Sequence, residues 1–181
     1  MKSIRTFFCI TCGGALLFTT ACGGPQAEYR TTSTLAEVMD GMVMPNADYV
    51  WKAVSTVSSA KGIVENAPHT ADEWETMREH AVTLMEASDL IQIPGRLVDK
   101  AGVQSKNPKI ELSPEVIKTM IDSDRASWIK HSHALHDAVA QMIKAIDGKN
   151  TEAVTAAGEV IDNACESCHK QYWYPESEQK K

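Results

Sequence analysis

Apolar side chains recur every three or four residues along four stretches of this chain, and that period predicts amphipathic helices. Two of the connections between the stretches are short and one is long, which is typical of an antiparallel up-down-up-down four-helix bundle. We therefore expect an all-α domain over residues 33–175. The four predicted helices run from about 33 to 62, from 70 to about 93, from 113 to 147, and from 150 to about 174.

The ends of these helices carry sequence signals. Thr70 and Glu73 predict a capping box at the start of the second helix, and Pro114 opens the third. Within the first stretch, Pro45 is expected to kink or break the helix, because it has no N–H and its ring clashes with the preceding turn. The connection over 94–112 is long and polar, and such loops in compact domains often serve function.

Five residues near the C-terminal end carry the clearest chemical signal: Cys165, Glu166, Ser167, Cys168 and His169. This Cys-x-x-Cys-His pattern attaches a c-type haem. The two thiols lie on one side of a helical turn, where they can add to the two vinyl groups on one porphyrin edge. His169 follows directly and can ligate the iron. One stretch of backbone thus supplies covalent attachment and an axial ligand, and we expect one covalent haem c.

Two other kinds of site fit a Cys-x-x-Cys pair less well. Structural zinc needs four ligands, and the exported part of the chain has no second cysteine pair, while His131, His133 and His136 have a spacing that fits no zinc finger. A thioredoxin-like dithiol normally opens a helix after a strand, whereas Cys165 and Cys168 lie at the end of a predicted helix. His131 is read as a hydrogen-bonded histidine of the bundle, with haem ligation as the alternative.

The N-terminal residues have the pattern of an export signal. Lys2 and Arg5 precede a mostly apolar stretch over 7–18, which is too short to span a membrane. We expect a signal peptide over 1–21 and delivery to the periplasm. The small residue before Cys22 predicts a lipoprotein with its lipid anchor on Cys22, and ordinary cleavage nearby to give a soluble product is the alternative.

The net charge of the exported part limits the kinds of binding partner that we expect. The chain has 18 basic and 24 acidic residues, of which the predicted signal takes two basic and no acidic ones, leaving a net charge of −8. An acidic protein is a poor nucleic-acid binder and is steered toward redox partners with a basic docking patch. No hydrolytic constellation stands out, so we do not expect an enzyme. Polar residues over 22–32 and 176–181 are expected to form a tether and a tail.

A helical bundle with this motif on its last helix, followed by the aromatic residues 172–174, resembles the class II c-type cytochromes, which are cytochrome c-prime and its low-spin Met/His-ligated relatives. The resemblance covers about residues 33–174 in helix order and motif position. Pro45 and the predicted lipid anchor depart from the family pattern. Three segments resemble, more narrowly, a little-characterised bacterial branch: Leu35–Trp51, Ile93–Arg96 and Cys165–Pro175.

The resemblance implies one haem at one end of the bundle, with thioethers from Cys165 and Cys168 and His169 on the proximal side of the iron. In that family a residue early in the first helix faces the distal side. Met39 matches this position best, and Met42 is the runner-up. A methionine ligand implies a six-coordinate, low-spin iron and a one-electron carrier. If the methionines only fill the core, the open iron binds or senses small gases such as nitric oxide or carbon monoxide.

The bundle topology places the long loop at the haem end. Its Arg96 is a candidate partner for a haem propionate, because arginine pairs well with carboxylates, and an exposed arginine without that role is the alternative. The resemblance also implies a homodimer as a common state of the family.

Overall fold

The computed structural model describes residues 29–60 and 62–175, and it is mostly helical, as the sequence predicts. Its elements are α1 (Leu35–Val38), the π-helical segment η1 (Met39–Val43), α2 (Met44–Ala53), β1 (Ser55–Ser59), β2 (Gly62–Asn66), α3 (Ala71–Leu90), α4 (Pro114–Ser123), α5 (Arg125–Asp147) and α6 (Thr151–Tyr172). The predicted signal peptide over 1–21, Cys22, most of the tether and the tail lie outside the described residues. Across the described ranges, none of the helices is both long enough and apolar enough to cross a membrane.

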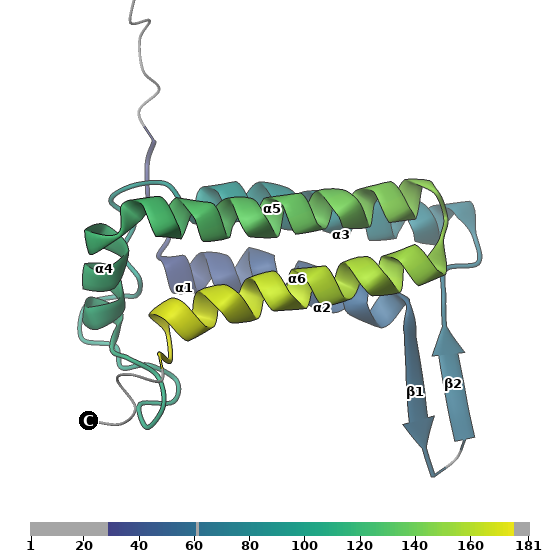
Figure 1. Cartoon of the computed structure of the whole chain (residues 1–181), viewed down its shortest axis with the longest axis horizontal. Coiled ribbons are helices and arrows are strands. Elements are labelled where there is room, and N and C mark those ends of the chain that lie inside the picture. The colour runs from purple at the N-terminus through teal and green to yellow at the C-terminus, as the bar shows by residue number, and fades with distance from the viewer. Residues whose placement is uncertain (1–28, 61, 176–181) are drawn as a thin grey trace, which may run out of the picture.

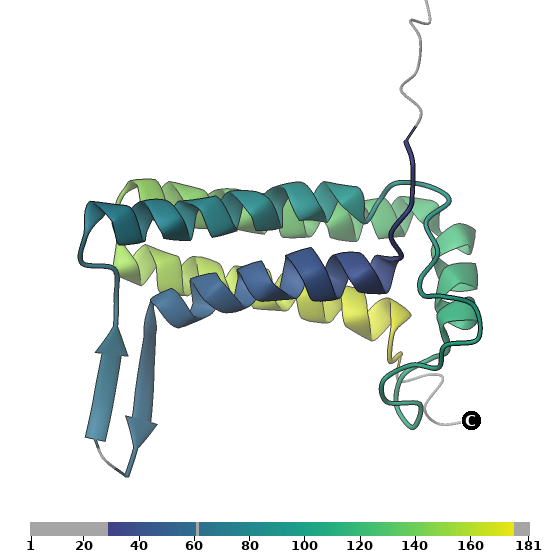
Figure 2. The same ribbon diagram turned by 180° about the vertical axis from the view of Figure 1, so that it is seen from behind.

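Four rows of helix lie side by side: α1–η1–α2, α3, α5 and α6 (Figures 1 and 2). α3 packs against α5, α5 against α6, and α2 against α3, whereas α2 makes few contacts with α6. α4 crosses the end of the bundle where α1 begins and α6 ends (Figure 1). The seam between the first row and α6 is therefore the most sparsely packed side of the bundle.

The core between α3 and α5 is fixed by two buried polar contacts as well as by apolar packing. Trp128 is 1% exposed, and its Nε1 donates to the carbonyl oxygen of Ile91 at 3.0 Å. The Ser132 hydroxyl donates to the carbonyl oxygen of Ser88 at 2.6 Å. A buried polar group left without a partner costs more than a hydrogen bond contributes, so these contacts fix how α5 lies against α3. α6 then packs against α5.

The helix starts agree with the sequence signals. Thr70 and Glu73 form the predicted capping box of α3, in which the Glu73 carboxylate accepts from the Thr70 N–H at 2.9 Å. Ser113 caps α4 with Pro114 in its first turn, and Asn150 caps α6. These caps satisfy N–H groups that a helix leaves unpaired at its start.

Pro45 was expected to kink or break the first helix, and the structure shows a local interruption: the π-helical segment η1 separates α1 from α2 just before Pro45. The helix widens just before it, and the Met44 N–H donates to the carbonyl oxygen of Met39, five residues earlier. Pro45 then lies in the first turn of α2, where a missing N–H costs least. The π-helical turn accommodates the proline, so that the helical row continues without a gap.

The first helix is shorter than predicted and ends at Ala53 instead of running to about 62. Residues 55–59 and 62–66 form an antiparallel hairpin whose register pairs Ser55 with Asn66. Serine and β-branched residues dominate this stretch, and they favour a strand over a helix. The three-residue spacing of Val54 and Val57 matches a helical period, but it does not reflect a helix here. The hairpin projects from the bundle at the end away from α4 (Figure 2).

The predicted third helix is in fact two helices, α4 and α5, which meet at Asp124. Asp124 leaves the helical conformation, with φ −131° and ψ 62°, and its carboxylate accepts from the Ser127 N–H at 3.1 Å. Short polar side chains such as aspartate compete for backbone donors in this way and interrupt helices. Ile117 and Ile121 therefore belong to the helix that covers the bundle end and do not extend α5.

Candidate functional site

The Cys-x-x-Cys-His motif lies in the last turns of α6, as the sequence predicts. Cys168 is 8% exposed and belongs to the core, while Cys165 and His169 are half-buried. Both cysteines are free thiols. The motif thus faces partly into the bundle, at the end that α4 crosses (Figure 1).

Burial makes the two thiols poor acids. It raises the pKa of Cys165 to about 11, with a further contribution from the Asp162 carboxylate. Burial also raises the pKa of Cys168 to about 12, and the neighbouring Cys165 adds to this effect. A redox-active dithiol needs the opposite, a lowered pKa that makes the attacking thiolate. The environment therefore argues against the thioredoxin-like function.

The raised pKa values of the two thiols can be tested by measuring how fast they are alkylated. In the folded, haem-free chain at pH 8, iodoacetamide is expected to alkylate Cys165 and Cys168 at least roughly tenfold more slowly than in urea, because only the thiolate reacts. Peptide-resolved mass spectrometry of timed samples measures both rates. Equal rates with and without urea would mean that the folded chain activates these thiols.

His169 is held in the form that can bind a metal. Burial lowers its pKa, against the opposing effect of the Glu166 and Glu111 carboxylates. A neutral imidazole keeps a nitrogen lone pair for ligation. The rings of Trp173 and Tyr174 lie beside it, with centroids at 5.7 Å and 6.1 Å.

A cavity of about 200 Å³ lies next to His169. Met39 lines it too, and so does Met44, whereas Met42 does not. The two residues predicted as axial ligands, His169 and Met39, thus line one cavity, and the alternative distal ligand Met42 does not line it. Its other walls come from α4 and the loop before it, including Val98, Lys106, Leu112, Pro114 and Ile117.

The residues at this end of α6 are those that a haem c needs: the His169 imidazole and the Met39 thioether line the cavity, while the thiols of Cys165 and Cys168 precede His169 on α6 and are not among the lining residues. The volume is smaller than the roughly 300–1,000 Å³ of typical cofactor sites. Admitting a porphyrin would therefore need side chains of the surrounding loop to move outward. Lys106 and Asp40, which pair at 2.7 Å on the cavity wall, are more than half exposed and free to do so.

Arg96 does not line this cavity. Its Nη1 donates to the carbonyl oxygen of Ser33 at 2.6 Å, and its Nε donates to that of Leu90 at 3.3 Å. These contacts hold the loop against the start of α1, and they do not support the propionate role, which stays a prediction. Lys106 is the cation on the cavity wall, and sequence reasoning missed it. A loop lysine gives no periodic signal, since its position depends on the path of the loop.

The loop is joined to the first helix by backbone hydrogen bonds. The N–H groups of Leu35 and Ala36 donate to the carbonyl oxygens of Leu97 and Val98, at 2.8 Å and 2.9 Å. These are donors that the start of a helix leaves unpaired. The segment carrying Met39 and the loop that walls the cavity are therefore held together.

The residues after the motif have two different roles. Tyr172 is 1% exposed and packs edge-on against Trp128, with centroids 5.1 Å apart, so it closes the bundle. Trp173 and Tyr174 instead line the cavity, and the Tyr174 hydroxyl donates to Glu166 at 2.6 Å. His131 lies elsewhere, bonded to a glutamine side chain of α6 at 2.8 Å, which agrees with the hydrogen-bonded reading.

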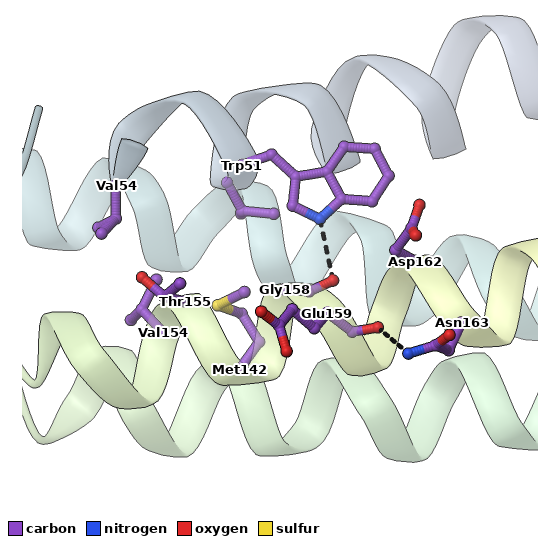
Figure 3. A pocket seen from close by; sticks show the side chains of 10 residues that line it. Trp51, Val54, Met142, Val154, Thr155, Gly158, Glu159, Asp162 and Asn163 are labelled. Atoms are coloured by element: carbon purple, nitrogen blue, oxygen red, sulfur yellow. Dashed lines mark hydrogen bonds between the residues drawn. The ribbon is translucent and has the colours of Figure 1, made fainter. Parts of the chain in front are cut away.

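A second, larger cavity of about 480 Å³ lies between α2 and α6 (Figure 3). The Trp51 indole N–H crosses this seam and donates to the carbonyl oxygen of Gly158 at 3.2 Å. Among the described residues that line it, Met142 is the one with a sulfur atom, and the motif residues are not among them. It therefore offers no set of axial ligands.

Comparison with known proteins finds no matching family model and no matching curated protein. Among solved structures, the chain is similar to the ferrous form of a leucine-to-valine mutant of cytochrome c prime from Alcaligenes xylosoxidans, at 17% identity over 77% of this chain and 94% of that one, with a TM-score of 0.48. A nitric oxide complex of a leucine-to-isoleucine mutant of that protein gives 16% identity, 78% and 98% coverage, and the same TM-score. Because these values are low, the function below rests on the chain's own residues.

Proposed function

We propose that this protein is an exported monohaem c-type cytochrome that carries single electrons, with His169 and Met39 as the axial ligands of its iron. The observation that carries the proposal is that Met39 and His169 line one cavity, and that His169 directly follows the attachment motif in the last turns of α6. In this proposal the helical rows form an antiparallel up-down-up-down bundle of the low-spin class II type.

Each residue has a defined task. Cys165 and Cys168 hold the group through thioether bonds, which fixes it to the last turns of α6. His169 presents a neutral imidazole from the same helix. Met39 supplies a soft thioether from the first helical row, a ligand that raises the reduction potential. A haem c bound there supplies a one-electron iron couple.

The walls around these ligands favour electron transfer over chemistry on a substrate. Ile117, Val98 and Leu112 give the cavity an apolar lining. With both axial positions filled by protein ligands, no position remains for a substrate, so we propose a carrier and not an enzyme. The net charge of −8 on the exported part supports a redox partner with a basic docking patch. The predicted export signal supports a location in the periplasm. We further propose that Cys22 carries a lipid anchor and that the protein forms a homodimer.

The test is an absorption spectrum of the purified holoprotein, oxidised, reduced and then exposed to carbon monoxide. We expect low-spin spectra in both oxidation states, the weak near-infrared sulfur-to-iron band when oxidised, and slow or absent carbon monoxide binding. A high-spin spectrum that shifts at once with carbon monoxide would instead show an open iron and support binding or sensing of small gases. A protein without haem bands would overturn the assignment of the motif itself.

A further inference from the structure

The π-helical turn brings two methionines to one cavity. In an α-helix, residues five apart point about 140° away from each other, because each residue turns the chain by about 100°. In η1 the Met44 N–H pairs with the Met39 carbonyl oxygen, five residues earlier, so each residue turns the chain by less. Met39 and Met44 both line the cavity beside His169. The direction in which Met39 points thus depends on this turn staying wide.

A buried side chain holds the turn. Asn46 is 9% exposed, and its Nδ2 donates to the carbonyl oxygen of Met42 at 2.6 Å. In an α-helix that carbonyl would accept from the backbone N–H of residue 46. Here the side-chain amide of Asn46 donates to that carbonyl, one residue after a proline that has no N–H to offer.

A second residue orients the amide from a neighbouring helix. Because Nδ2 of Asn46 faces a carbonyl, its Oδ1 faces His80 of α3, whose Nδ1 lies 2.7 Å away and must carry the proton. The His80 ring is stacked on Tyr49, with centroids 3.8 Å apart and planes at 18°. A chain of contacts therefore runs from α3 through Asn46 to the turn that carries Met39.

We infer that Asn46 is a positioning residue for the distal ligand: its amide holds the π-helical turn open, anchored by His80, and so aims the Met39 sulfur at the iron site. The inference rests on the proposed function, since it requires that Met39 ligates the iron. It makes Asn46 act through Met39, without touching the haem.

The experiment is the substitution Asn46→Asp in the full-length holoprotein. Aspartate has the shape of asparagine and still accepts from His80, but it has no N–H to donate to the Met42 carbonyl. Asn163→Asp is the matched control, because Asn163 makes the same kind of contact at an exposed position of α6, where it donates to the carbonyl oxygen of Glu159, four residues earlier, at 2.8 Å. His80→Phe is a second variant, which keeps a ring on Tyr49 and removes only the donor.

We expect Asn46→Asp to give a mixture of low-spin and high-spin haem, to weaken the sulfur-to-iron band, and to speed carbon monoxide binding by roughly fivefold to tenfold, the effect of one lost hydrogen bond. His80→Phe should move the same signals less, and Asn163→Asp should match the wild type. Far-UV circular dichroism shows whether each variant is folded. If Asn46→Asp does not fold, the spectra of His80→Phe test the positioning role instead.

The outcomes separate the two proposals. A low-spin wild type with unchanged spectra in folded Asn46→Asp, or in His80→Phe if Asn46→Asp does not fold, overturns the positioning role and leaves the ligand assignment intact. A high-spin wild type overturns Met39 ligation, and the positioning role with it.

Discussion

Replacing both Cys165 and Cys168 with serine is expected to give a protein that retains no haem after denaturation. Serine has nearly the size of cysteine, but its hydroxyl does not add to a vinyl group, so both covalent links are lost. Each single variant should keep one link and a reduced amount of attached haem. Haem staining after denaturing electrophoresis and the mass of the intact chain measure the attachment.

The result depends on a chain that still folds. Cys168 belongs to the core, and a hydroxyl buried there without a partner costs on the order of 1–3 kcal/mol. Circular dichroism of the double variant is therefore part of the experiment. Cys22→Ser is the matched control, since it removes a cysteine outside the motif and should change lipidation without changing haem attachment. Haem that stays bound to the double variant through denaturation would contradict the attachment sites.

Replacing Met39 with alanine is expected to convert the haem completely from low spin to high spin and to let carbon monoxide bind at once. The thioether on the cavity wall is the proposed distal ligand, and alanine has no donor atom. Met39 is only half-buried, so the loss of packing should lower the free energy of unfolding by about 1–2 kcal/mol, less than a fully buried methionine would. Spectra of both oxidation states, with and without carbon monoxide, measure the change.

Met44 makes a second variant necessary, because it lines the same cavity. If Met39→Ala stays low-spin and the Met39→Ala/Met44→Ala double variant is high-spin, the distal ligand is Met44. If both remain low-spin, neither Met39 nor Met44 is the distal ligand. Met42→Ala is the control from the same turn, since Met42 does not line the cavity and should leave the spectra unchanged.

The part of the site that lies within one helical turn could be predicted from the sequence alone. Attachment by Cys165 and Cys168 with ligation by His169 needs residues at fixed short spacing, so a linear motif contains most of the geometry. Met39 was chosen by the resemblance to the class II cytochromes, and the structure places it on the same cavity as His169. Met44 was not identified with the cavity, because an α-helix would turn it away and only the π-helical turn brings it back.

The features that sequence reasoning missed depend on competition between local and distant interactions. At Asp124 a side chain captures a backbone N–H and ends one helix while starting the next, although the apolar spacing continues across it. Arg96 and Lys106 differ in role only because of the path that the loop takes, which no periodic pattern describes. The hairpin over 55–66 had a signal in its β-branched residues that the helical spacing of its valines masked.

That hairpin is expected to be much less stable locally than the helical bundle. All of β2 is exposed, and a two-stranded hairpin with little support is marginally stable in water. Its hydrogen bonds should open often while the bundle stays folded, and its amide protons should exchange with solvent far sooner than those of α3 or α5. A protease cut there would detach no helix from the bundle. It would divide the chain into a short piece carrying Met39 and a long piece carrying His169, held together by the contacts of α2 with α3 and of α1 with the loop.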